Sequence, residues 1–215
     1  MKELIAGRAA RLLRPGWVVN LGVGIPTLVS KYLDPDAIYL HTENGMLGVG
    51  PPPPPDRVDP NLVDAGKRPI TQRAGAAYFD SAASFAMIRG GHVDAAVLGA
   101  LQVDQEGRIA NWAIPGEPVL GVGGAMDLLS GVRSVIVVMT HATSEGKPKV
   151  VARCSLPLTS LRPADWVVTE LCTFRLEGEG LLLTELAAGV TIEEVRARTE
   201  ARFEERLPAS GQATG

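Results

Sequence analysis

Cysteine is scarce in this sequence. Cys154 and Cys172 are the only two among 215 residues, and neither lies in a CxxC pair or in a Cys/His cluster with metal-ligand spacing. We therefore expect no metal site and two reduced, packed thiols, although spacing alone leaves a disulfide between them open. Long apolar runs are also missing, and charges interrupt the apolar pattern of the N-terminal MKELIAGRAARLLRPG. We expect no membrane span, no signal peptide and a cytoplasmic location.

An excess of basic charge is missing as well. The 21 basic and 24 acidic residues give a net charge of -3, with no lysine tract or arginine-rich face, so we expect no nucleic-acid partner. No GxSxG, HExxH or GxxxxGK[ST] motif is present, which argues against a serine hydrolase, a zinc enzyme and a phosphate-loop protein. The three histidines, His41, His92 and His141, are scattered, and we interpret each as structural or superficial.

The apolar residues, 46% of the chain, are enough for a sizeable core. Short apolar runs rich in β-branched residues predict buried strands over residues 17–21, 38–41, 93–98, 132–139 and 166–169. Helical spacing predicts helices over residues 2–13, 26–33, 81–89 and 125–129, and a last helix from Ile192 to about Leu207 with Thr191 as its N-cap. The alternation predicts one α/β domain over residues 1–207, an open, largely parallel sheet with helices on both faces, and a C-terminal tail over residues 208–215.

The segment over residues 49–72 does not fit this alternation. Five consecutive prolines, Pro51 to Pro55, followed by DRVDPNLVDAGKRP, exclude a regular helix or a central strand. We predict a long ordered loop or flap, which at this length is more often functional than a plain surface excursion.

Three glycine loops follow predicted strands. They are NLGVGIP over residues 20–26, ENGMLGVGP over residues 43–51 and GVGGAMD over residues 121–127. None completes the GxGxxG pattern of a dinucleotide site. Their backbone amides, at strand ends and near helix N-termini, are suited to anions and to developing oxyanions.

Glu43 is the acidic residue with the most informative position. It directly follows the predicted strand IYLHT and opens a glycine loop, which places its carboxylate in the crevice at the end of the sheet. Such a carboxylate can act as a nucleophile. The alternative is that Glu43 only accepts backbone amides and stabilises the turn at Asn44 and Gly45.

At this point the motifs resemble a known family. HTENGMLGVGP is similar to the catalytic SENG motif of the second (beta) chain of class I CoA-transferases, with Thr42 where the family commonly has serine. The resemblance extends from residue 2 to about residue 206. It continues, in the family's order, through NLGVGIPT, DPNLVDAGKRPIT, FDSAASFAMIRGGHVDAAVLGALQVDQEGRIANWAIPG, GVGGAMDLLSGV, CSLPLTS and GLLLTEL. It is strongest to the glutamate-bearing (beta-type) chains of succinyl-CoA:3-ketoacid CoA-transferases, followed by 3-oxoadipate and acetate/acetoacetate enzymes. The five-proline stretch departs from the common pattern and leaves the path of the flap open.

The resemblance implies a chemistry and a set of site residues. Glu43 would attack an acyl-CoA thioester and become a glutamyl-CoA thioester, which a carboxylic acid then discharges, so no metal or redox cofactor is needed. The remaining residues are expected to stabilise oxyanions or to bind CoA. They are Asn20 as a side-chain donor, Gly123 and Gly124 as the oxyanion loop, Gln102 at the site wall and Lys67 near a CoA phosphate, with a solvated surface charge as the alternative for Lys67.

The resemblance covers only the glutamate-bearing half of the family's active site. It implies a separate alpha (A) subunit in an α2β2 assembly, with succinyl-CoA as donor and a short 3-oxoacid as acceptor. Two rival functions stay open: an anion or sugar-phosphate sensor on a similar sheet, and an acyl-CoA hydrolase in which water intercepts the intermediate. A sensor has no need of a carboxylate beside its anion site, because the charge would repel the ligand.

Overall fold

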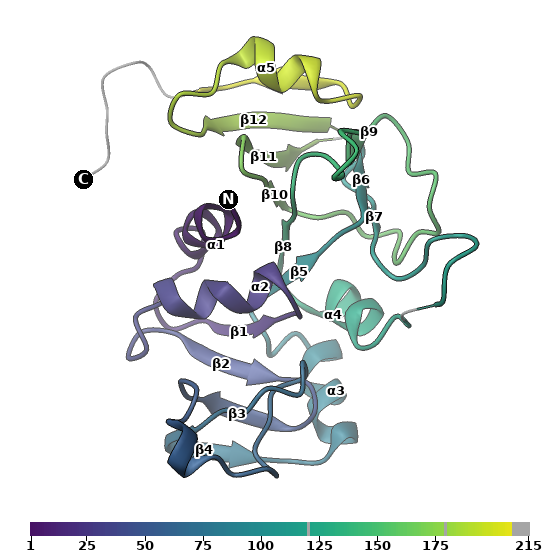
Figure 1. Cartoon of the computed structure of the whole chain (residues 1–215). Helices are drawn as coiled ribbons and strands as arrows, with labels where there is room; N and C mark the ends of the chain where they lie inside the picture. The colour runs from purple at the N-terminus through teal and green to yellow at the C-terminus, as the bar shows by residue number, and fades with distance from the viewer. Residues whose placement is uncertain (120, 179, 208–215) are drawn as a thin grey trace.

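The core of the protein is a ten-stranded sheet whose centre is parallel (Figure 1). The computed structural model describes residues 1–119, 121–178 and 180–207. The five central strands are β10 (Trp166–Val168), β8 (Ser134–Val138), β5 (Ala95–Gly99), β1 (Val18–Leu21) and β2 (Tyr39–Thr42). Each is parallel to its neighbour. These are the buried strands that the sequence predicts, with slightly shifted ends.

Antiparallel strands extend the sheet at both edges. At one edge the added strands are β3 (Met46–Val49) and β4 (Gln72–Tyr78). At the other edge they are β11 (Cys172–Glu177) and β12 (Gly180–Leu186), followed by β13 (Phe203–Glu205), which is parallel to β12. The order is therefore β13-β12-β11-β10-β8-β5-β1-β2-β3-β4. A small separate sheet is formed by β7 (Ile109–Ala110), β6 (Gln102–Asp104) and β9 (Val150–Val151).

Helices cover both faces of the parallel centre (Figure 1). The elements on one face are α1 (Lys2–Ala10), α2 (Ile25–Leu28) and the 3₁₀ turn η1 (Val29–Tyr32), and those on the other are α3 (Ser81–Arg89) and α4 (Ala125–Gly131). Strand β5 shows why both faces need to be covered, because its successive residues point to opposite faces and all are apolar. Ala95 and Val97 belong to the buried cluster that contains Ile5, whereas Ala96 belongs to the cluster that contains Ile88. The predicted fold class is confirmed.

The last predicted helix is wrong in its second half. Helix α5 (Ile192–Ala197) begins as expected, with the Thr191 side chain accepting a hydrogen bond from the Glu194 amide, but it ends ten residues before the predicted end at Leu207. The chain then forms β13, whose Phe203 packs edge-on against Phe174. Strand pairing with β12 satisfies backbone groups at the sheet edge, and this tertiary gain outweighs local helical spacing. The predicted tail, residues 208–215, lies outside the described residues.

The predicted flap is an ordered loop between β3 and β4. Its base is closed by two backbone hydrogen bonds, from the Gly50 amide to the Thr71 carbonyl (2.7 Å) and from the Thr71 amide to the Pro51 carbonyl (3.0 Å). Within it lie a single 3₁₀ turn, η2 (Pro55–Arg57), and an antiparallel bridge between Val63 and Pro69. The prolines prevent regular structure, as expected.

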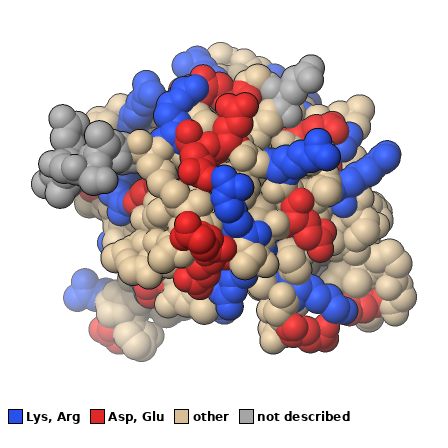
Figure 2. Space-filling view, turned by 90° about the horizontal axis from the view of Figure 1, so that it is seen from above, with Lys and Arg blue, Asp and Glu red and all other residues tan. Residues whose placement is uncertain are grey.

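Charges of both signs are interspersed on the face of the molecule seen in Figure 2. Exposed ion pairs such as Arg206 with Glu177 (2.9 Å) also occur on the surface. Within the described residues, no helix combines the length and apolar character required to cross a membrane. Cys154 and Cys172 are both free thiols, and burial raises the pKa of each to about 12.

Candidate active site

The direction in which successive strands are added to the sheet reverses at β1, and such a position favours a ligand site. Strand β1 pairs with β2 on one side and with β5 on the other, so consecutive crossovers leave it in opposite directions. In open α/β sheets the crevice at the carboxyl ends of such strands is where ligands bind. Asn20, in β1, and Glu43, directly after β2, both lie at this end.

Glu43 is held by the side chain of Asn20. The amide nitrogen Nδ2 of Asn20 donates a hydrogen bond of 2.9 Å to Oε2 of Glu43. Asn20 is fully buried, whereas Glu43 is only partly buried, so the carboxylate lies between a fixed donor and solvent. A hydrogen bond to a carboxylate is strengthened by its charge and fixes the orientation of the group. The structure thus brings Asn20 and Glu43 together, and their roles in a reaction stay predictions.

The glycine loop before α4 closes one side of the Glu43 side chain. A Cβ atom added to Gly124 would lie 3.3 Å from Cγ of Glu43 and 3.3 Å from the ring of Phe85. A methyl group at this position would therefore fit only if the side chain of Glu43 or Phe85 moved by a few tenths of an ångström. Gly123, with a left-handed φ of 53°, turns the chain just before it. The structure thus brings Gly124 and its loop beside Glu43, as the resemblance implies, and the role of Gly123 and Gly124 as an oxyanion loop stays a prediction.

The flap is attached to the residues on either side of Glu43. The hydroxyl of Thr42 donates to Oδ1 of Asn44 (2.6 Å) and accepts from the backbone amide of Ala65 (3.0 Å). The side-chain amide of Asn44 donates to the carbonyl of Val63 (2.9 Å). A hydroxyl at position 42 is therefore sufficient for this connection, whether serine or threonine supplies it.

A buried histidine that sequence reasoning assigned to a structural role also lies in the site. His41 is only 4% exposed, and its Nδ1 lies 3.2 Å from Nδ2 of Asn20, while its Nε2 lies 3.2 Å from Oγ of Ser84. Burial lowers its pKa to about 4, so the imidazole is neutral at neutral pH. The sequence carried one signal for this placement. Residues two apart in an extended segment point to the same side, and His41 lies two residues before Glu43.

Two predicted site residues are not joined to Glu43 by a contact. Gln102 uses its amide oxygen to accept from the backbone amides of Ser155 (3.0 Å) and Leu156 (3.1 Å), so its polar groups hold that loop. Lys67 lies at an exposed turn of the flap with a left-handed φ of 62°. Their roles in CoA binding stay predictions.

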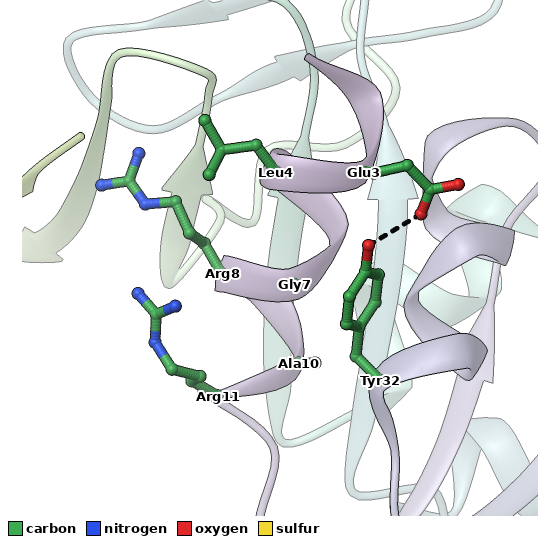
Figure 3. A pocket seen from close by; sticks show the side chains of 7 residues that line it. All are labelled: Glu3, Leu4, Gly7, Arg8, Ala10, Arg11 and Tyr32. Carbon is green, nitrogen blue, oxygen red and sulfur yellow. Dashed lines mark hydrogen bonds between the residues drawn. The ribbon is translucent and has the colours of Figure 1, made fainter. Parts of the chain in front are cut away.

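A separate hollow lies beside α1 and η1 (Figure 3). It has a volume of about 520 Å³, and its lining comprises Glu3, Leu4, Gly7, Arg8, Ala10, Arg11 and Tyr32. The Tyr32 hydroxyl donates to Glu3 (2.9 Å), and the buried Arg8 donates to the Thr169 carbonyl (3.1 Å). The polar groups of this hollow are thus largely paired within the chain, in contrast to the partly open carboxylate of Glu43.

The two buried histidines, His41 and His141, should make the folded protein less stable at acid pH. His141, fully buried between the hydroxyls of Thr169 (3.0 Å) and Thr199 (2.8 Å), also has a pKa lowered to about 4 by burial. An unfolded imidazole binds a proton near pH 6.5 and a folded one only near pH 4, so the unfolded state holds more protons between these values. The free energy of unfolding should therefore be highest above about pH 6.5. It should fall by roughly 2 kcal/mol for each buried histidine as the pH is lowered from 6.5 to 4.5.

This expectation is checked by urea unfolding at several pH values. His141→Gln keeps groups that can bond to the neighbouring hydroxyls but cannot take up the proton. Its unfolding free energy should fall less steeply between pH 6.5 and pH 4.5 than that of the unmodified chain. His92→Gln serves as the matched control. An equal slope in His141→Gln and the unmodified chain would contradict the assignment.

With this geometry established, comparisons with known proteins give a consistent result. Residues 2–198 match the family model described as Coenzyme A transferase. The chain is 51% identical over 205 residues to the beta chain of acetate CoA-transferase from Escherichia coli K12, covering 94% of this chain and 93% of that protein. It is 47% identical over 207 residues to the corresponding chain of succinyl-CoA:3-ketoacid coenzyme A transferase from Helicobacter pylori 26695, covering 96% and 100%.

Solved structures agree at the level of the fold. The apoenzyme of the acyl-CoA transferase YdiF from Escherichia coli O157:H7 superimposes with a TM-score of 0.76 at 23% identity. The match covers 97% of this chain and 43% of that one, so this chain spans less than half of YdiF. Glutaconate coenzyme A-transferase from Acidaminococcus fermentans gives a TM-score of 0.71 at 16% identity, covering 98% of this chain and 89% of that one.

Proposed function

Because this chain belongs to the coenzyme A transferase family, we propose that it is the glutamate-bearing subunit of a CoA-transferase and that Glu43 is its nucleophile. The observation that carries the proposal is the 2.9 Å hydrogen bond from Asn20 to the Glu43 carboxylate at the switch point of the sheet. The carboxylate is oriented from the buried side by an amide and is open on the other side.

The reaction proceeds through two kinds of covalent intermediate, an anhydride and a thioester. An oxygen of Glu43 attacks the thioester carbonyl of the acyl-CoA, the C–S bond breaks, and an acyl-glutamyl anhydride and the CoA thiolate result. The thiolate then attacks the glutamyl carbonyl carbon and releases the first carboxylic acid, which leaves a glutamyl-CoA thioester. The acceptor carboxylate reverses both steps. The thioester is conserved, so we propose that no metal or redox cofactor takes part.

The residues around Glu43 suit these steps. When the thiolate attacks the glutamyl carbonyl, negative charge develops on an Oε atom of Glu43, the group that Asn20 already contacts. A donor placed there before the reaction stabilises the oxyanion without rearrangement. Gly124 brings backbone rather than a side chain against Glu43, and the loop of Gly123 and Gly124 is the proposed second source of donors.

The relatives support a short carboxylic acid as acceptor. We propose succinyl-CoA as donor and a 3-oxoacid as acceptor, in line with the name of the Helicobacter pylori relative. Acetate is the second candidate, supported by the name of the Escherichia coli relative. Parallel assays with acetate, acetoacetate and succinate as acceptors separate the two, because the preferred acid should show the highest kcat/KM.

We further propose a partner alpha (A) subunit in an α2β2 assembly. The support is that both of these curated relatives are named as single subunits, while the longer YdiF chain contains more than twice the matched length. Co-expression with the alpha subunit should yield a stable complex, and transfer activity should need both chains.

The test of the proposed nucleophile is a covalent adduct. The chain purified with its partner is exposed to an acyl-CoA without an acceptor acid, and the intact mass and peptide map are measured. A CoA adduct on the Glu43 peptide that disappears when a carboxylic acid is added would support the transferase. Release of free acid and CoA without transfer would favour the hydrolase. Absence of any adduct in a complex that binds acyl-CoA would overturn the proposal and favour the anion sensor.

A further inference from the structure

A chain of hydrogen bonds leads from helix α3 to Glu43, through the side chains of Ser84, His41 and Asn20. The steps are Ser84 Oγ to His41 Nε2 (3.2 Å), His41 Nδ1 to Asn20 Nδ2 (3.2 Å) and Asn20 Nδ2 to Glu43 Oε2 (2.9 Å). Asn20 and Ser84 are fully buried and His41 is 4% exposed. Three separate elements, α3, β2 and β1, thus contribute one side chain each.

We propose that His41 and Ser84 are positioning residues, which hold the Asn20 amide in the one orientation that donates to Glu43. The inference rests on the proposed role of Glu43 and adds residues to it. His41 does not touch the carboxylate; it acts through Asn20. Ser84 in turn fixes the imidazole from the opposite side.

The direction of each hydrogen bond follows from charge. An ionised Glu43 can only accept, so the Asn20 group that faces it must be the NH₂ and not the carbonyl oxygen. The second hydrogen of the same NH₂ then points to Nδ1 of His41, which must be the unprotonated nitrogen. The proton of the neutral imidazole is therefore on Nε2, where it donates to Oγ of Ser84.

The carbonyl oxygen of Asn20 supports this assignment. Oδ1 is buried and accepts no hydrogen bond from the described residues. A free amide would turn to satisfy this oxygen, so its orphaned state indicates that the contacts on Nδ2 determine the orientation. A protonated Nδ1 at His41 would favour the flipped amide, with Oδ1 toward the imidazole. The pKa of His41, lowered by burial to about 4, keeps the imidazolium rare at neutral pH, and the contact of Nδ1 with the Asn20 NH₂ favours the neutral tautomer that has no proton on Nδ1.

The surroundings hold the imidazole in place. Phe79 stacks on His41 with a ring separation of 5.8 Å and an angle of 13°. The Phe79 amide donates to the Gly45 carbonyl (3.0 Å), which ties the start of α3 to the turn after Glu43. Asp80 caps α3 by accepting from the Ala83 amide (2.8 Å). Ser84 is therefore presented from a fixed helix end.

The experiment compares three variants in the complex with the alpha subunit. His41→Leu removes the acceptor, His41→Asn places a carbonyl oxygen at the position of Nδ1, and Ser84→Ala removes only the outer contact. We expect His41→Leu to slow glutamyl-CoA formation by about 10- to 100-fold with little change in KM for acyl-CoA, because an interaction needed in the transition state is lost. His41→Asn should restore most of the rate, and Ser84→Ala should cost less than His41→Leu.

The outcomes separate this inference from the proposed function. If the unmodified complex forms the adduct and His41→Leu and Ser84→Ala form it equally fast, the positioning role is wrong while Glu43 stays the nucleophile. If His41→Asn is as slow as His41→Leu although both retain native melting temperatures, the acceptor role is also wrong. If the unmodified complex forms no adduct, it is the proposed function that fails.

A spectroscopic measurement keeps the inference testable if His41→Leu does not fold. Nitrogen-15 shifts of the imidazole distinguish the two neutral tautomers, and the full chain has only three histidines. We expect His41 to carry its proton on Nε2 at neutral pH, with its resonance assigned by its absence in His41→Asn. A proton on Nδ1 would overturn the inference.

Discussion

Replacing Glu43 with glutamine is expected to lower CoA transfer by at least about a thousandfold, because an amide cannot form the acyl anhydride. The substitution is nearly isosteric, and its Oε1 can still accept the hydrogen bond from Nδ2 of Asn20. The fold should therefore be retained, with a melting temperature close to that of the unmodified protein. Initial rates of acyl-CoA transfer and the intact mass after exposure to acyl-CoA are the measurements.

Two further variants sharpen this experiment. Glu43→Asp keeps the charge but withdraws the carboxylate by one methylene, so it should form the adduct slowly rather than not at all. Glu145→Gln changes an exposed glutamate whose side chain is 71% accessible, and it should leave the rate unchanged. Retention of a tenth or more of the activity in Glu43→Gln would mean that another group carries the CoA.

The second large effect is expected at Gly45. This residue has a φ of 122°, in the region that favours glycine, and a Cβ atom added to it would lie 2.1 Å from the carbonyl oxygen of Phe79. Gly45→Ala thus combines backbone strain with a clash against main chain, which cannot rotate away. We expect a loss of roughly 3 kcal/mol or more in the free energy of unfolding, and slower adduct formation because the turn after Glu43 must shift.

Gly75→Ala is the matched control for this substitution. Gly75 also has a left-handed φ, of 80°, but a Cβ atom added there would meet nothing within 4 Å. It should cost only about 1 kcal/mol, the strain of the backbone alone, and should leave the adduct rate unchanged. Denaturant unfolding and the rate of glutamyl-CoA formation are measured for both. Equal losses of stability would show that the clash with Phe79 is relieved without cost.

The central strands were predictable because their signal is local. Strands β5 and β8 are buried on both faces, so the sequence shows an unbroken apolar run at each. The place of Glu43 at the end of a strand was predictable for a related reason, because IYLHT leads directly into an Asn-Gly turn. The alternative for Glu43, that it only accepts backbone amides, finds no such bond among the described residues; the side chains of Thr42 and Asn44 instead bond to each other and to the flap.

The features that were missed depend on contacts between distant residues. His41 was interpreted as structural because its partners lie 21 residues before it and 43 residues after it, on two other elements. The last helix was extended too far because Phe203 fits the helical spacing as well as it fits a strand. The segment around Phe203 forms a strand because it pairs with β12 and because Phe203 contacts Phe174. Neither contact can be deduced from the neighbouring sequence.

The hydrogen bonds of the flap fix some of its residues and leave others free to vary in sequence. Its bonds to Thr42 and Asn44 come from Ala65 and Val63, and its base is closed next to Gly50. Pro51 belongs to the base, and Pro52 to Pro55 lie between these two anchorages, where the chain can change length or composition without altering either one. Related proteins can therefore diverge in this outer arc while Glu43 keeps its place.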